Sequence, residues 1–172
     1  LIVDWETNGR RIKNFKDNNG KLLSRPQNLN FQFREAVTWS LTSSSSIPLC
    51  ARYRPTGYVF DVNGMSAFPM NDGVPSFYSV GLLNSYIPQR SLQFINPTMA
   101  FQSGDISRVP LPKYPANDTN LGPATSCVDI SRSDWDSFET SWDFDCQPLL
   151  NPDYRQPTLK ATYQKLRAHW RE

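Results

Sequence analysis

The chain has 172 residues, of which 38% are hydrophobic and 13% aromatic, a composition that predicts a globular protein with a real core. It contains no run of about 18 apolar residues, so the sequence predicts no transmembrane helix. The three cysteines, Cys50, Cys127 and Cys146, are odd in number and widely spaced. This pattern favours reduced thiols in the cytoplasm over a disulfide framework.

The net charge of +2 is distributed unevenly. Residues 1–112 carry 11 Lys and Arg against 7 Asp and Glu, a net charge of +4, whereas residues 113–172 carry 7 against 9, a net charge of −2. A basic front part fits a phosphate-facing surface and equally fits an ordinary solvated one. The chain starts without Met on residues typical of structured protein, so we expect a fragment of a longer protein.

The front part predicts short strands joined by turns. Asn-Gly steps favour tight turns, and they predict a hairpin of residues 11–15 with residues 21–24. Aromatic and β-branched residues predict a strand that starts after Ala36. Further short strands are expected at residues 51–53, 58–62 and 67–69.

Helical patterns follow. Apolar periodicity predicts a helix over residues 76–95 that Pro88 kinks or divides into two, followed by a turn and a short strand at residues 101–102. Residues 113–127 have the composition of a linker. Aromatic spacing predicts a helix over residues 135–142. An amphipathic helix is predicted over residues 158–171, and its apolar stripe consists of Leu159, Tyr163, Leu166 and Trp170.

Motifs that would carry catalysis are weak. Asn151-Pro152-Asp153-Tyr154 partly matches the Asn-Pro-Pro-Tyr loop of amino-methyltransferases, but its third residue is Asp and no Gly-rich cofactor loop precedes it. We interpret it as a plain Asn-Pro turn. The carboxylates of residues 134–145 lack the Lys-containing arrangement of nucleases, and His169, the single histidine, has no nucleophile context. The sequence therefore predicts no catalytic, metal-binding or cofactor-binding residue.

Basic and amide side chains in the front part are the stronger candidates for function. Arg reads guanine and Asn or Gln reads adenine in the major groove, whereas Lys and Ser hold phosphates. The alternative is that these polar loops are simply solvated. The predicted DNA contacts are Arg10, Arg11, Lys13, Arg25, Gln27, Asn28, Arg34, Ser44, Ser45, Arg52 and Arg54.

Several stretches occur in an order that resembles a known family. They are Phe-Arg-Glu-Ala-Val-Thr-Trp-Ser at 33–40, Gly-Leu-Leu-Asn-Ser at 81–85, Asn-Pro-Thr-Met-Ala-Phe-Gln-Ser-Gly-Asp-Ile at 96–106 and Asp-Trp-Asp-Ser-Phe-Glu-Thr-Ser-Trp-Asp-Phe at 134–144. Together they resemble the C-terminal region of the PglX family, the adenine-specific DNA methyltransferases of BREX phage-exclusion systems, which is related to type IIG restriction-methylation enzymes. The stretch at 81–85 is shared more broadly among target recognition domains.

The resemblance implies a fold and a role. It implies an α+β target recognition domain over residues 1–112, in which helices support strands and loops, followed by a linker and partly helical extension over residues 113–172. It also implies a parent enzyme that uses S-adenosylmethionine bound in an N-terminal methyltransferase domain, so this fragment would be non-catalytic and would bind double-stranded DNA. The expected partners also include the N-terminal methyltransferase domain and other defence-system subunits. The alternative is a protein-interaction module of the same complex without direct DNA contact, in which residues 135–144 and 158–171 dock a partner subunit or a phage inhibitor.

Overall fold

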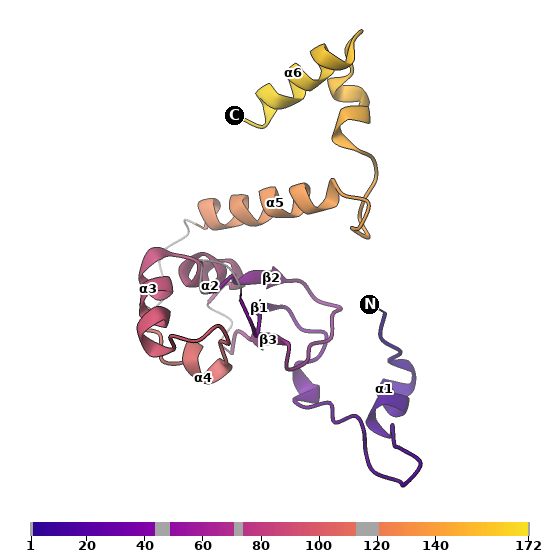
Figure 1. Cartoon of the computed structure of the whole chain (residues 1–172), viewed down its shortest axis with the longest axis vertical. Helices are drawn as coiled ribbons and strands as arrows, with labels where there is room; N and C mark the ends of the chain where they lie inside the picture. The colour runs from indigo at the N-terminus through magenta and orange to yellow at the C-terminus, as the bar shows by residue number, and fades with distance from the viewer. Residues whose placement is uncertain (1, 44–48, 71–73, 113–120, 172) are drawn as a thin grey trace. The chain divides into compact units, whose positions relative to one another are not determined.

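The computed structural model describes residues 2–43, 49–70, 74–112 and 121–171. Helices and one antiparallel sheet confirm the predicted α+β class (Figure 1). The chain divides into two compact units, Leu1–Ala124 and Thr125–Glu172. The elements are α1 (Glu6–Lys13), η1 (Leu29–Phe31), β1 (Ala36–Ser40), β2 (Arg52–Arg54), β3 (Gly64–Ala67), α2 (Ser76–Leu83), α3 (Tyr86–Ile95), α4 (Ser103–Ile106), α5 (Gly122–Asp136), η2 (Pro148–Leu150), η3 (Pro152–Tyr154) and α6 (Leu159–His169).

The sheet of the first unit has the order β2-β1-β3, with both pairings antiparallel. Successive side chains of a strand point to opposite faces, and Val37 and Trp39 of β1 are both buried on one of them. Tyr53 lies opposite Val37 and stacks on Phe77 of α2, with ring centroids 4.6 Å apart. Figure 1 shows α2, α3 and α4 gathered to one side of the sheet. The core therefore forms between this face of the sheet and the helices.

The strand after Ala36 is confirmed as β1, and the predicted strand at 51–53 is β2, displaced by one residue. The strand predicted at 67–69 is wrong in its bounds, because β3 starts earlier, at Gly64. The strand predicted at 58–62 is absent from the described chain. In this segment both backbone groups of Phe60 are hydrogen-bonded to the side chain of Gln32. The Phe60 N–H donates to Gln32 Oε1 at 3.1 Å, and Gln32 Nε2 donates to the Phe60 carbonyl at 3.5 Å.

Residues 76–95 form two helices, α2 and α3, as one of the two alternatives predicted. The break lies at Asn84 and Ser85 rather than at Pro88. Pro88 falls in the first turn of α3, where a helix does not need the missing backbone N–H. Proline is therefore tolerated there and stays buried in the core.

Two side-chain amides at this junction hold the approach to β2. The Ala51 N–H donates to Asn84 Oδ1 at 2.9 Å, and Asn84 Nδ2 donates to the Ala51 carbonyl at 2.8 Å. Gln89 repeats the arrangement on Leu49, with distances of 3.1 Å to the N–H and 2.7 Å to the carbonyl. Each amide thus pairs with the main chain as a neighbouring strand would.

A second polar cluster closes the first unit after α3. Asn96 Nδ2 donates to the Ala100 carbonyl and to Asp105 Oδ2, each at 2.8 Å. The same Asp105 oxygen accepts the Gln102 N–H at 2.9 Å and completes a capping box at the start of α4. The strand predicted at 101–102 is wrong. A single isolated bridge between Thr42 and Ala100 stands in its place.

The predicted N-terminal hairpin is half correct. The Leu23 N–H donates to the Phe15 carbonyl at 2.8 Å, and Lys16 bridges Leu22, so the part near the turn is formed. The beginning of the first arm, from residue 11, lies in α1 instead. The backbone inside α1 is left-handed at Thr7, Asn8 and Gly9, where φ is 49°, 58° and 70°, and a Cβ at Gly9 would lie 3.2 Å from the Trp5 ring.

In the second unit, α6 is confirmed and begins at the Thr158 cap. Of its predicted stripe only Leu166 is buried, whereas Leu159, Tyr163 and Trp170 are exposed. The helix α6 contacts η2 and η3. The linker predicted over 113–127 is wrong from Gly122 onward, where α5 begins; residues 113–120 lie outside the described ranges.

The helix predicted over 135–142 is also wrong. The α5 helix ends at Asp136, and the Ser137 hydroxyl donates back to the Asp134 carbonyl at 2.6 Å. The aromatic residues Trp135, Phe138 and Trp142 are all exposed. No helix in the described ranges combines the length and hydropathy that a bilayer crossing needs.

Candidate nucleic-acid interface

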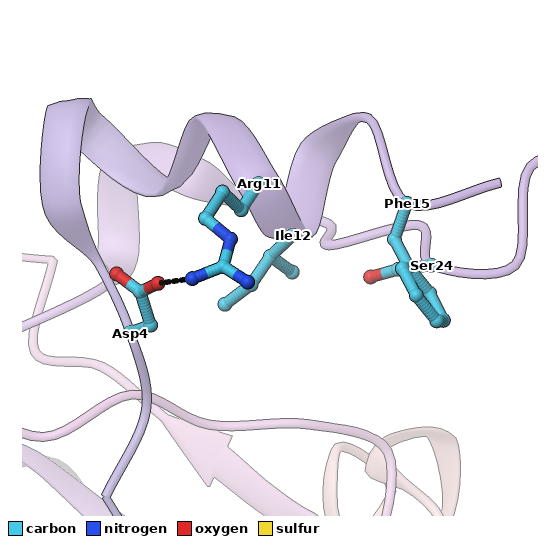
Figure 2. A pocket seen from close by; sticks show the side chains of 5 residues that line it. All are labelled: Asp4, Arg11, Ile12, Phe15 and Ser24. Atoms are coloured by element: carbon cyan, nitrogen blue, oxygen red, sulfur yellow. Dashed lines mark hydrogen bonds and ion pairs between the residues drawn. The ribbon is translucent and has the colours of Figure 1, made fainter.

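The predicted contacts at α1 gather around two adjoining hollows. The first, of about 300 Å³, is lined by Asp4, Arg11, Ile12, Phe15 and Ser24 (Figure 2). The lining residues of the second, of about 490 Å³, are Arg10, Arg11, Asn14, Phe15 and Lys16. Arg11 and Phe15 belong to both, so the two hollows form one surface, which we call the α1 surface. Here the structure brings together Arg10 and Arg11 of the predicted set and adds Lys16.

Charge on the α1 surface is mostly uncompensated. Arg11 Nη1 lies 2.9 Å from Asp4 Oδ2, and the side chain of Arg11 is 82% exposed (Figure 2). Such an exposed pair contributes little to stability and is screened by salt. Arg10 and Lys16 are exposed, and their side chains make no hydrogen bond or ion pair with any residue that the structure describes. Both cations are therefore available to a ligand.

Lys13 differs from its basic neighbours because it is half-buried. Its Nζ lies over the Trp5 ring, 5.8 Å from the centroid. Trp5 in turn meets Phe33 edge-on at 5.1 Å. Trp5 therefore links α1 to the loop before β1, and Lys13 packs on the Trp5 ring with its charge near the surface.

The loop candidates Arg25, Gln27 and Asn28 are exposed. Asn28 has a left-handed backbone, with a φ of 52°, and precedes η1. Asparagine tolerates this conformation better than most residues, which gives Asn28 a turn-forming role as well. None of these three residues is among the described residues that line the α1 surface.

Around the sheet, Arg52 is exposed on β2, and its side chain has no hydrogen bond or ion pair with the described residues. Arg34 is exposed, stacks on Phe31 at 5.1 Å and reaches the Pro69 carbonyl at 3.4 Å. Ser44 and Ser45 lie outside the described residues.

Arg54 is placed unlike the other predicted contacts, because it is only 8% exposed. Its guanidinium lies over the rings of Phe60 and Phe68, at 5.1 and 5.5 Å. It donates to Ser66 Oγ at 3.1 Å and to the Arg34 carbonyl at 3.4 Å, while Nε has no partner within the described ranges. Burial lowers the pKa of Arg54 below its ordinary value. These contacts assign Arg54 a structural task in holding β2, β3 and the loop between them together.

Sequence reasoning missed Phe15, the most informative residue of the α1 surface. Its side chain is 57% exposed although phenylalanine is ordinarily buried. An aromatic residue within a run of basic and amide residues, from Arg10 to Lys16, is the signal that could have found it. In the arm of a hairpin, which the sequence predicts here, the ring would instead be expected to pack.

The remaining motif has the expected geometry of a turn. Asn151 Oδ1 accepts the Asp153 N–H at 2.9 Å and caps η3, so its amide serves the local backbone. In the described ranges, no three His, Cys, Asp or Glu side chains come together as metal ligands would.

No family model matches the chain. Two curated proteins are similar to it. An adenine-specific methyltransferase PglX from Lacticaseibacillus casei (strain Zhang) is 35% identical over 168 residues, 95% of this chain. An adenine-specific methyltransferase BrxX from Escherichia coli O9:H4 (strain HS) is 31% identical over 150 residues, 87% of the chain. The chain spans only 14% and 12% of the lengths of these relatives.

Proposed function

The chain belongs to the family of the PglX and BrxX adenine-specific methyltransferases, to which it is homologous over 95% and 87% of its residues, and we propose that it forms the DNA-recognition part of such an enzyme. The parent would methylate adenine N6 with S-adenosylmethionine, in phage defence or restriction-modification, in the cytoplasm. Since the chain corresponds to about one seventh of PglX, we place catalysis and the cofactor in an N-terminal methyltransferase domain outside it. Residues 1–112 would be the target recognition domain, and residues 113–172 its extension.

The α1 surface carries this proposal. Arg10, Arg11 and Lys16 line one surface, and Asp4 is the single carboxylate that lines it among the residues that the structure describes. Phosphate oxygens are the ligands that such a group of cations attracts most strongly in water. Arg25 and Arg52 are exposed as well and extend the set of available cations.

The mechanism is one of positioning. Contacts from lysine and arginine to phosphates would fix the register of the protein on the duplex, and contacts from Arg, Gln and Asn to base edges would select the sequence. The binding free energy then favours extrusion of one adenine into the catalytic domain. Arg54 would contribute by holding the sheet rather than by touching DNA.

A matched charge experiment tests the proposal in the full-length enzyme. Arg10, Arg11 and Lys16 are changed together to Gln, and the control changes three exposed basic residues of the second unit, Lys160, Arg167 and Arg171, in the same way. Duplex binding is measured by fluorescence anisotropy from low to physiological salt. For every phosphate that no longer meets a cation, the slope of log K against log salt flattens by about 0.9. We expect flattening for the first variant alone, and equal slopes for all three proteins would contradict the proposal.

The exposed apolar residues of the second unit favour a second candidate, a protein-interaction module. Trp135, Trp142, Leu159 and Trp170 are all exposed, which is costly for a unit of this size. In this alternative the unit would dock the N-terminal methyltransferase domain or another defence-system subunit, without direct DNA contact. Binding to a protein partner that is insensitive to salt, with no change of DNA affinity in the α1 variant, would favour it.

A further inference from the structure

We propose that the α1 surface binds a nucleotide whose base has left the duplex stack, with the base against Phe15 and its phosphate between Arg10, Arg11 and Lys16. This inference rests on the proposed function and specifies its ligand. The proposed site differs from a simple contact with the duplex backbone. Such a contact would use the cations and would not involve the exposed Phe15 ring.

The floor of the surface suits a flat apolar group. Ile12 and Phe15 line the first hollow, and Figure 2 shows Ile12 beside Arg11 with Phe15 across the hollow, next to Ser24. Stacking on aromatic rings is the common way in which proteins hold unstacked bases, and every base offers a face for it. A base inside a duplex has both faces covered by its neighbours, so this ring can stack only on a base that has left the duplex.

The backbone that carries the Phe15 ring is held in place by hydrogen bonds. The Phe15 N–H donates to the Ile12 carbonyl at 3.3 Å, and its carbonyl accepts the Leu23 N–H at 2.8 Å. The next residue, Lys16, bridges Leu22. These bonds come from both sides of the residue, so the ring is presented to solvent by a fixed backbone rather than by a free loop.

Cations stand where the phosphate of such a nucleotide would lie. Arg10, Arg11 and Lys16 line the second hollow together with Asn14 and Phe15. Arg11 is paired with Asp4, which is the one carboxylate at the first hollow within the described ranges. Because this ion pair is exposed, replacing Asp4 by a phosphate as the partner of Arg11 costs little free energy. The arrangement thus combines the apolar face and the adjacent positive charge that single-stranded nucleic acids require.

The test compares two DNA duplexes of the same flanking sequence in the full-length enzyme. One is fully paired, and the other has a short run of unpaired thymines, which contains no adenine for the catalytic domain. Phe15→Ala removes the ring, and Phe15→Trp keeps an aromatic face. Phe94→Ala is the matched control, because Phe94 is exposed on α3 and lies outside the α1 surface.

We expect Phe15→Ala to weaken binding of the duplex with unpaired thymines at least about fivefold, since one base stacked on an aromatic ring contributes roughly that much or more. Binding of the paired duplex should change less than about twofold, and Phe15→Trp and Phe94→Ala should bind the duplex with unpaired thymines within about twofold of the unaltered enzyme. If Phe15→Ala weakens both duplexes equally, or neither, the inference is wrong. If the unaltered enzyme binds neither duplex, even at low salt, the proposed function fails and this inference fails with it.

Discussion

Replacing Asn84 with alanine tests whether side-chain amides hold the approach to β2. The change removes two hydrogen bonds, from the Ala51 N–H at 2.9 Å and to its carbonyl at 2.8 Å. Each such bond contributes about 0.5–1.5 kcal/mol, so we expect the free energy of unfolding to fall by about 1–3 kcal/mol. The upper half of this range is favoured because Ala51 is only 5% exposed, and water replaces the missing partner poorly.

Urea denaturation measures this change as a lower midpoint at an unchanged m value. For a chain of this length, a loss of about 2 kcal/mol also lowers the melting temperature by about 4–8 °C. Hydrogen exchange of the Ala51 amide gives a local measurement, and its protection should fall more than the protection of β1. The control is Ser85→Ala, which removes an exposed hydroxyl bonded to the Leu82 carbonyl of the preceding helix. If Asn84→Ala and Ser85→Ala have the same stability within about 0.5 kcal/mol, the amides do not hold this segment.

Three further changes have expected outcomes that equilibrium unfolding can measure. Trp39→Phe removes the indole N–H that donates to the buried Phe101 carbonyl at 3.0 Å, and it should cost about 1–3 kcal/mol. Arg54→Lys loses the planar guanidinium and its ring contacts, so it should lower the free energy of unfolding. The slope of log K for DNA binding against log salt should not change, and a flatter slope would mean that Arg54 contacts DNA. Leu166→Ala should cost about 2–5 kcal/mol because Leu166 is 1% exposed, while Leu159→Ala, at a 72% exposed position of the same helix, should be close to neutral; equal costs would contradict the packing of α6.

The sequence predicted elements well where one local pattern decides the structure. The α+β class, the strand from Ala36 and the amphipathic helix after Thr158 are of this kind. Prediction failed where residues distant in the sequence determine the local structure. Residues 58–62 have the composition of a strand, but the Phe60 backbone is taken by Gln32, 28 positions away in the sequence.

The start of α5 has the composition of a linker because glycine and proline usually interrupt helices. At Gly122 and Pro123 they stand in the first turn, where proline costs little.

The sequence predicted the charged residues of the candidate site but not which residues surround them. Arginine is ordinarily an exposed residue, so the burial of Arg54 depends on Phe60 and Phe68, which no local pattern connects with it.

The amides of Gln32, Asn84 and Gln89 all hold main-chain atoms and not side chains. Every residue type except proline offers the same backbone N–H and C=O. These hydrogen bonds therefore do not restrict which residue types occupy the segments that they hold. The neighbouring exposed side chains can therefore be exchanged without releasing the backbone from its position. A protein built in this way could acquire a new sequence preference through changes in its loops while the scaffold beneath them stays the same.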